Sequence, residues 1–187
     1  MSIAAAHPLS KAALGHELIR VMVVDDAVVV RGLLARWIEA EAGLTVVASL
    51  RNGREAIEQL ERTDPDVVIL DVDMPEIDGI TALPRLIARR RDLVVIMAST
   101  LTRRNAEISL RALALGAADY IPKPESTREI TISAPFRREL IDKIRALGTR
   151  RKRRSMPTSA LAPAAPAAGL PHVASPEIAP ACSARAM

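Results

Sequence analysis

The segment VVILDVDMPEIDG, residues 67–79, decides the fold. It opens with four consecutive apolar residues, three of them β-branched, which is typical of a strand buried on both faces of a parallel sheet. The apolar run ends at Asp71, and Pro75 and Gly79 then indicate a loop. Doubly wound α/β proteins bind their ligands at the carboxyl ends of such strands. The segment therefore predicts a parallel sheet with an acidic site at one edge.

Outward from this segment, four more short apolar runs alternate with longer helical patterns. The predicted strands are Val21–Val24, Thr45–Ala48, Val67–Leu70, Val94–Ala98 and Asp119–Ile121. The predicted helices are Val29–Ala42, Gly53–Arg62, Ile80–Arg90, Arg104–Leu115 and Pro135–Leu147. Gly43, Gly116 and Gly148 follow three of these helices, where a left-handed cap is favoured. Five strands, each followed by a helix, indicate a doubly wound five-stranded α/β sheet, while the residues alone leave the strand order open.

Composition divides the 187-residue chain into three parts. Residues 1–18 are Ala-rich and are predicted to be a flexible extension, and residues 19–148 are predicted to fold as one domain. Residues 149–187 hold the basic run RRKRR at 150–154 and then a Pro/Ala-rich linker, which we predict to be disordered. The last part has six basic residues and one acid and so accounts for the net charge of +4 of the whole chain. We interpret the basic run as a solvated segment and expect no DNA-binding domain.

Other features of the chain exclude several classes of protein. The single cysteine, Cys182, excludes an intramolecular disulfide framework. The apolar runs are too short to span a membrane, and the N-terminus has no basic-then-apolar signal peptide. We therefore expect a soluble, cytoplasmic protein.

Polar side chains follow four of the predicted strands at their carboxyl ends. They are Asp25 and Asp26 after the first strand, Asp71 and Asp73 after the third, Ser99 and Thr100 after the fourth, and Lys123 after the fifth. Taken singly, the acids could cap a helix or end a strand, the hydroxyls could form turns, and the lysine could be an exposed loop residue. Since four separate loops would have to place them together by accident, we favour one common site.

Such a set of side chains supports a specific chemistry. Three carboxylates that converge without a cation would raise one another's pKa. Mg²⁺ prefers hard oxygen ligands and is often held by one or two carboxylates together with phosphate oxygens. An aspartate can then attack phosphorus, while the metal and a lysine neutralise the charge of the transferred phosphoryl group. The residues therefore predict Mg²⁺-dependent phosphoryl transfer to an aspartate.

At these positions the chain resembles the receiver domain of two-component response regulators. The resemblance rests on the motifs VVDD at 23–26, LDVDMP at 70–75, DG at 78–79, ST at 99–100, GA at 116–117 and KP at 123–124. It implies a flavodoxin-like fold with the strand order 2-1-3-4-5. It also implies a chemotaxis-type histidine kinase as the phosphoryl donor, and no enzyme activity in this chain beyond Mg²⁺-dependent self-phosphorylation.

The resemblance gives a role to each residue of the site. Asp71 is implied to be the phosphoacceptor and, with Asp25, Asp26 and the backbone carbonyl of Asp73, to bind Mg²⁺ or its water. Ser99 and Lys123 are implied to contact the phosphoryl group, and Ser99 and Tyr120 to act as the switch. Without the resemblance, Tyr120 is simply a half-buried aromatic at the end of a strand. The resemblance also implies a cis bond between Lys123 and Pro124.

A narrower resemblance is to the regulatory domain of the chemotaxis protein-glutamate methylesterase. It rests on ASTLT at 98–102, LRAL at 110–113 and LGAAD at 115–119. In that enzyme a linker and an esterase domain follow the receiver. Residues 150–187 resemble the linker, and we expect the esterase domain to be absent from this chain. The chain departs from the family at Ala27, where a serine is more usual.

Two other functions stay open at this point. Residues 71–73 also spell the Asp-x-Asp motif of haloacid-dehalogenase-type phosphatases, although that motif normally follows the first strand of its domain. The other alternative is a binding module that is no longer phosphorylated. We favour a phosphorylation-switched receiver that forms the regulatory half of a methylesterase-type regulator.

Overall fold

A computed structural model describes residues 18–100, 105–124 and 126–155. The predicted extension up to residue 17 and the predicted Pro/Ala-rich linker from residue 156 lie outside these ranges. The described elements are β1 (Ile19–Val24), α1 (Val28–Glu39), β2 (Leu44–Leu50), α2 (Gly53–Thr63), β3 (Val67–Asp71), α3 (Gly79–Arg89), β4 (Val94–Thr100), α4 (Asn105–Ala114), β5 (Asp119–Lys123), α5 (Thr127–Ile132) and α6 (Ala134–Ser155). Among the described helices, none has the length and apolar character needed to cross a membrane.

The five strands form one parallel sheet in the order β2-β1-β3-β4-β5. This order confirms the predicted α/β class and the flavodoxin-like arrangement that the resemblance implied. The chain moves from β1 to one side for β2 and then crosses to the other side for β3. The carboxyl ends of β1 and β3 therefore meet where the connections diverge, which is the ligand-binding position of such sheets.

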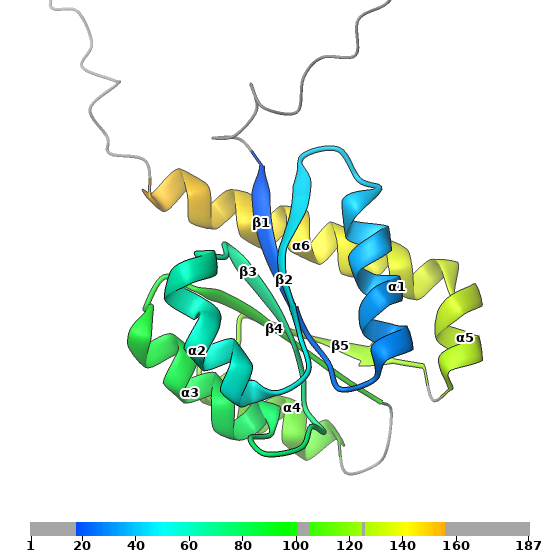
Figure 1. Ribbon diagram of the computed structural model, residues 1–187, viewed down its shortest axis with the longest axis horizontal. Helices are drawn as coiled ribbons and strands as arrows, with labels where there is room; N and C mark the ends of the chain where they lie inside the picture. The colour runs from blue at the N-terminus through cyan, green and yellow to red at the C-terminus, as the bar shows by residue number, and fades with distance from the viewer. Residues whose placement is uncertain (1–17, 101–104, 125, 156–187) are drawn as a thin grey trace, which may run out of the picture. The chain divides into compact units, whose positions relative to one another are not determined.

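Helices cover both faces of the sheet (Figure 1). Along β1, Val21 and Val23 belong to the core under α1, α5 and α6, whereas Met22 and Val24 belong to the core under α2, α3 and α4. Successive side chains of a strand point to opposite faces, so a strand covered on both sides must be apolar throughout. This explains the unbroken apolar runs in the sequence.

Short-range contacts explain where several helices begin and end. Asn52 and Asp78 are the N-caps of α2 and α3, and their side-chain oxygens accept hydrogen bonds from the N–H groups of Glu55 and Thr81 at 2.8 and 2.7 Å. Each bond satisfies a backbone donor that the helix itself cannot pair. Gly116 follows α4 with a φ of 103°, as predicted for a left-handed cap. Gly43 also has a positive φ, of 83°, but the C-cap of α1 is Ala40, so Gly43 belongs to the turn before β2 and its predicted role as a helix cap is wrong.

The last helix differs from the prediction. It was expected to end at Leu147, but α6 continues to Ser155 and includes the whole basic run at 150–154. Gly148 lies inside this helix, where a Cβ atom would approach Ile19 Cγ2 to 2.7 Å. The glycine therefore permits close packing of α6 on β1, and its predicted role as a helix cap is wrong.

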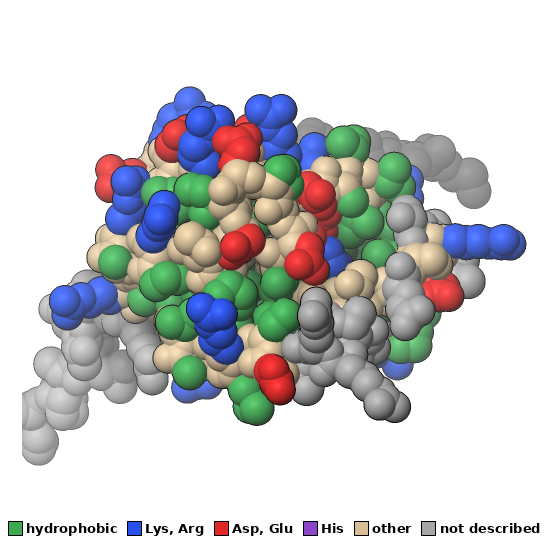
Figure 2. All heavy atoms as spheres, turned by 90° about the horizontal axis from the view of Figure 1, so that it is seen from below, with side chains coloured by type: hydrophobic (Ala, Val, Ile, Leu, Met, Phe, Trp, Pro, Cys, Tyr) green, Lys and Arg blue, Asp and Glu red, His purple; other side chains and the backbone are tan. Residues whose placement is uncertain are grey.

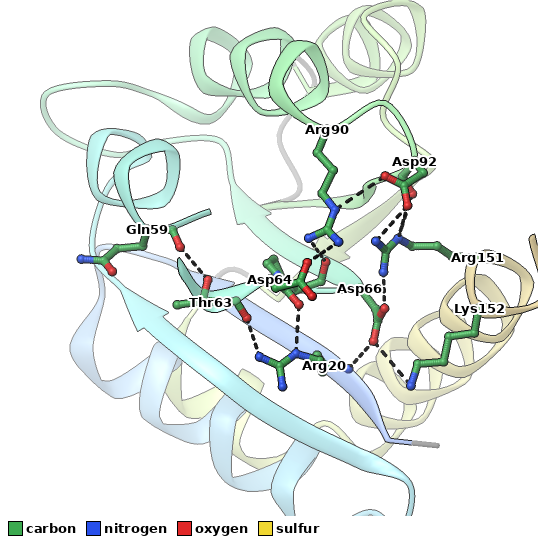
Figure 3. Close-up of polar contacts among 10 residues, drawn as sticks. Arg20, Gln59, Thr63, Asp64, Asp66, Arg90, Asp92, Arg151 and Lys152 are labelled. Atoms are coloured by element: carbon green, nitrogen blue, oxygen red, sulfur yellow. Dashed lines mark hydrogen bonds and ion pairs between the residues drawn. The ribbon is translucent and has the colours of Figure 1, made fainter. Parts of the chain in front are cut away.

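Ion pairs with the buried Asp66 and the exposed Asp92 explain why the helix extends this far. Figure 3 shows Arg151 pointing from α6 toward Asp66 and Asp92, and Lys152 toward Asp66. Arg151 is only 7% exposed and Asp66 only 6%. Asp66 also accepts a hydrogen bond from the backbone N–H of Arg20 at 2.8 Å, so it joins β1, β3 and α6. The predicted domain end at residue 148 is therefore wrong, and so is the solvated state of the basic run at Arg151 and Lys152, whereas Arg150 is exposed as predicted.

The chain between β5 and α6 holds two further differences. The helix α5 was not predicted, and its N-cap is Ser126, whose hydroxyl accepts a hydrogen bond from the N–H of Glu129 at 3.2 Å. The cis bond implied for Lys123 and Pro124 is wrong, because the described residues include no cis peptide bond.

Candidate functional site

Side chains from three strand ends meet at the carboxyl edge of the sheet. Asp25 directly follows β1, Asp71 ends β3 and Lys123 ends β5. The Lys123 ammonium lies 2.8 Å from Asp71 Oδ1 and 3.0 Å from Asp25 Oδ2. Asp25, Asp71 and Lys123 are 1%, 5% and 5% exposed. Buried charges persist in proteins when they are paired, and here one ammonium bridges two carboxylates.

Asp26 adds a third carboxylate at the solvent side of this group. One oxygen each of Asp25, Asp26 and Asp71 lies within 4.8 Å of the others. Asp26 is exposed, and a hollow of about 300 Å³ opens beside it. Figure 2 views this edge of the molecule, and acidic side chains gather near its middle.

The donor set fits a divalent cation. Three carboxylates offer hard oxygen atoms, and the open side of the hollow leaves room for water, as Mg²⁺ requires. With Lys123 present, the group keeps an excess of two negative charges, which one divalent ion would balance. Asp73 lines the same hollow, but its exposed side chain is not part of the oxygen cluster. Its role as a backbone ligand stays a prediction.

Burial and ion pairing have opposing effects on the pKa of Asp71 and on that of Lys123. Burial raises the pKa of Asp71 from the ordinary 3.8 to about 6, although the Lys123 ammonium opposes this rise. Burial alone would lower the pKa of Lys123, but the carboxylates of Asp71 and Asp25 outweigh it and raise that pKa. At neutral pH the site therefore holds a charged ammonium and an ionised, poorly solvated carboxylate.

Backbone contacts fix the loops that carry the acids. Asp25 Oδ1 accepts a hydrogen bond from the N–H of Ala27 at 2.9 Å. Ala27 is itself the N-cap of α1 and makes no side-chain cap bond, so the helix-cap interpretation of the paired acids does not hold. After β3, a Cβ atom at Gly79 would lie 2.0 Å from the carbonyl oxygen of Asp71, which explains the glycine at this position.

The side chain of Tyr120 contacts the backbone of Ser99. Ser99 is fully buried near the end of β4, and Thr100 lines the hollow. Tyr120 is half-buried, and its hydroxyl donates a hydrogen bond to the carbonyl oxygen of Ser99 at 3.4 Å. Burial raises the pKa of this hydroxyl. The part of the ASTLT motif at residues 101–102 lies outside the described residues.

Sequence reasoning missed two contributors to the site. Arg31 of α1 donates from Nη1 to the carbonyl oxygen of Asp25 at 2.6 Å. Ile130 of α5 lines the hollow. Neither residue could be identified from the sequence, because an arginine on a helix is ordinarily exposed and α5 itself was not predicted.

Three comparisons place the chain among known proteins. The family model for the response regulator receiver domain matches residues 21–134. The protein-glutamate methylesterase/protein-glutamine glutaminase of Nitrobacter winogradskyi is 62% identical over 153 residues, which are 82% of this chain and 36% of that protein. The crystal structure of the response regulator domain of Thermotoga maritima CheB is 39% identical with a TM-score of 0.61, and the match covers 71% of this chain and 97% of that one. The CheX-CheY-BeF3-Mg²⁺ complex from Borrelia burgdorferi is 29% identical with a TM-score of 0.53, and the match covers 60% and 83% of the two chains.

The chain spans between 36% and 47% of the length of the first curated relatives that it matches. The family model, in contrast, covers more than half of the chain and includes every residue of the site from Asp25 to Lys123. The chain belongs to the response regulator receiver domain family.

Proposed function

We propose that this receiver domain is switched by phosphorylation of Asp71, with a chemotaxis-type histidine kinase as the donor. The observation that carries the proposal is the buried Lys123 ammonium between Asp71 and Asp25, with the exposed Asp26 carboxylate beside them. A structural ion pair gives no reason for a further, exposed carboxylate beside it, whereas in a site for a metal and a phosphoryl group that carboxylate supplies a hard oxygen ligand.

Asp71 acts as the nucleophile in this proposal. Lys123 and the N–H of Val72 both contact Oδ1, at 2.8 Å each, so Oδ2 is the atom that we infer to attack. A new bond forms between Oδ2 and the phosphorus of the kinase phosphohistidine while the phosphorus–nitrogen bond breaks, and the leaving imidazole takes up a proton. The ionised state of Asp71 at neutral pH supplies the electron pair.

Asp25, Asp26 and Asp71 would hold Mg²⁺, together with the backbone carbonyl of Asp73. The bound ion would neutralise charge on the transferred phosphoryl oxygens. The similar Borrelia burgdorferi complex contains Mg²⁺, which supports this choice of metal.

The switch follows from the contacts of the buried residues. A phosphoryl group on Asp71 would place new anionic oxygens beside Lys123 and attract the Ser99 hydroxyl. Because the Tyr120 hydroxyl binds the Ser99 carbonyl, a shift of Ser99 would move Tyr120 as well. Tyr120 is half-buried on the edge strand β5, so its movement would change the exposed surface.

The relatives suggest what the switch controls. Since they carry the name protein-glutamate methylesterase/protein-glutamine glutaminase, we propose that the receiver regulates an esterase domain of that type. The 187-residue chain itself is expected to release no methanol from methylated chemoreceptors. Its three histidines, His7, His16 and His172, lie outside the described residues, so the described part of the receiver holds no histidine that could act as the base for a serine nucleophile.

The phosphatase alternative has no support in the structure. Its Asp-x-Asp motif would need both acids at the reacting centre, but Asp73 is exposed and lies outside the oxygen cluster formed by Asp71. The motif also follows the third strand of the chain, and the family match is to receivers.

Intact-protein mass spectrometry after incubation with acetyl phosphate and Mg²⁺ tests the proposal. The wild-type chain should gain one phosphoryl group, and Asp71→Asn should gain none. Asp142→Asn, which changes an exposed acid of α6, is the matched control and should behave as wild type. Labelling that persists in Asp71→Asn or in excess chelator would refute the proposal, and a chain that is never labelled would favour the non-phosphorylated binding module.

A further inference from the structure

The two adjacent acids of the site are held in different ways. The Asp25 carboxylate is fixed by Lys123 and by the N–H of Ala27, and the Asp25 N–H donates to the carbonyl oxygen of Leu50 at 3.0 Å. The Asp26 carboxylate is exposed and makes no hydrogen bond or ion pair within the described part of the chain. Its direction therefore depends on the backbone that carries it.

The helix that follows does little to fix this backbone. The N-cap of α1, Ala27, has no side chain that can bond to the first turn, and that turn holds no acidic residue. Its first residues, Val28 and Val29, are exposed and β-branched, which is a poor start for a helix. Another group must hold the loop that leads into α1.

Arg31 reaches back from the first turn of α1 to this loop. Its Nη1 atom lies 2.6 Å from the carbonyl oxygen of Asp25 and 3.5 Å from that of Asp26. One guanidinium nitrogen thus bonds closely to the Asp25 carbonyl and lies near the next one, so it restrains the orientation of the peptide planes that carry the two acids. The side chain of Arg31 is half-buried, and a charged donor makes a stronger hydrogen bond than a neutral one.

We propose that Arg31 is a positioning residue for the divalent cation site, and that it holds the backbone of Asp25 and Asp26 so that the Asp26 carboxylate faces Asp71. This inference rests on the proposed Mg²⁺-dependent function. Groups of this kind, which orient ligands without touching the ion, typically contribute a factor of about ten or more to metal affinity.

The proposal and simple electrostatics predict opposite changes in Mg²⁺ affinity when Arg31 is replaced. A guanidinium near a cation site repels the cation, so loss of its charge alone would tighten Mg²⁺ binding. Loss of a positioning contact would weaken it. Arg31→Met removes both charge and contact, whereas Arg31→Lys keeps the charge and loses the planar fork.

The test is a titration of the ¹⁵N-labelled full chain with Mg²⁺, followed by the amide signals of Ala27 and Val72. We expect the Kd for Mg²⁺ to rise about tenfold in Arg31→Met and severalfold in Arg31→Lys. Arg36→Met removes the same charge from an exposed position of α1 and should leave the Kd unchanged. The thermal midpoint of each variant is measured alongside, because a merely structural arginine would lower it without changing the Kd.

The outcomes separate the two proposals. If the wild-type chain shows no response to Mg²⁺, the proposed function fails. If the wild type responds and Arg31→Met binds Mg²⁺ as well as or more tightly than wild type, the positioning role is overturned. Should Arg31→Met fail to fold, Arg31→Lys decides the question, and an unchanged Kd in that variant counts against the role.

Discussion

At the scale of single residues, the carboxylates of the site are electrostatically unfavourable to one another. Asp25 and Asp71 share one ammonium in a buried space, and burial is the main cause of the raised pKa of Asp71. Strain of this kind is typical of functional sites, where stability is lower than the fold could provide.

The pH dependence of stability follows from that shift. The Asp71 carboxyl has a pKa of about 6 in the folded chain and an ordinary value of 3.8, so between these values the folded state binds more protons than the unfolded state. The free energy of unfolding should therefore fall as the pH rises from 4 to 6, by roughly 2–3 kcal/mol at most.

Asp71→Asn should remove this fall in the free energy of unfolding, because the amide does not ionise. Without Mg²⁺ the variant is expected to be more stable than wild type at pH 7 and nearly equal to it at pH 4, as measured by urea unfolding in chelator. A variant that is less stable than wild type at pH 7 would show that the Lys123 pairing outweighs the burial of the Asp71 carboxylate.

Most of the charged groups that meet at the site could be predicted from the sequence, but the side chain that contacts its backbone could not. Asp71 and Lys123 follow apolar runs that mark strand ends, so their residue types and positions were informative. Arg31 acts through backbone carbonyls, and such a contact depends on a loop conformation that no residue pattern encodes.

At the scale of elements, the join between β3 and α3 is the tightest part of the site. Gly79 N–H donates to the carbonyl oxygen of Val72 at 2.9 Å, and there is no space for a side chain at Gly79. Gly79→Ala should displace the loop after Asp71, lower the free energy of unfolding by about 2 kcal/mol or more and slow phosphorylation.

Gly32→Ala is the matched control for this substitution. Gly32 lies in α1 with open space around it, so alanine there should raise the free energy of unfolding by about 0.5–1 kcal/mol through its higher helix propensity. Equal effects of the two alanines in chemical denaturation would show that close packing at Gly79 is unimportant.

The far end of α6 depends on the buried ion pair between Arg151 and Asp66. Arg151→Met would leave Asp66 buried with a weaker set of partners, and removal of one partner from such a pair typically costs about 3–5 kcal/mol. Arg150→Met changes an exposed neighbour and should have little effect. Hydrogen exchange of the last turns of α6 measures both variants, and unchanged protection in Arg151→Met would contradict the importance of this pair.

Helix ends were predicted least well, for physical reasons. The five strands and four of the helices lie close to their predicted positions, because apolar periodicity reports burial. The end of α6 depends on Asp66 and Asp92, which are distant in sequence from Arg151 and gave no local signal. Gly148 was misleading because glycine serves both as a helix cap and as a point of close packing.

At the scale of the whole described domain, the sheet separates two polar regions. The acidic site lies at the carboxyl ends of the strands. The ion pairs of Arg151 with Asp66 and Asp92 lie at the opposite edge, where β1 and β3 begin (Figure 3). The strand order could not be derived from the residues alone, since apolar runs that are buried on both faces look alike. The resemblance to receivers supplied that order, and the sheet confirms it.

The most direct test is to locate the phosphoryl group chemically. An aspartyl phosphate is a mixed anhydride, and borohydride reduces it to homoserine at the modified position. After treatment with acetyl phosphate, Mg²⁺ and borohydride, peptide mass spectrometry should find homoserine at position 71 and nowhere else. Homoserine at Asp25, Asp26 or Asp73, or none at all in a chain shown to be folded and Mg²⁺-bound, would contradict the assignment of Asp71 as the phosphoacceptor.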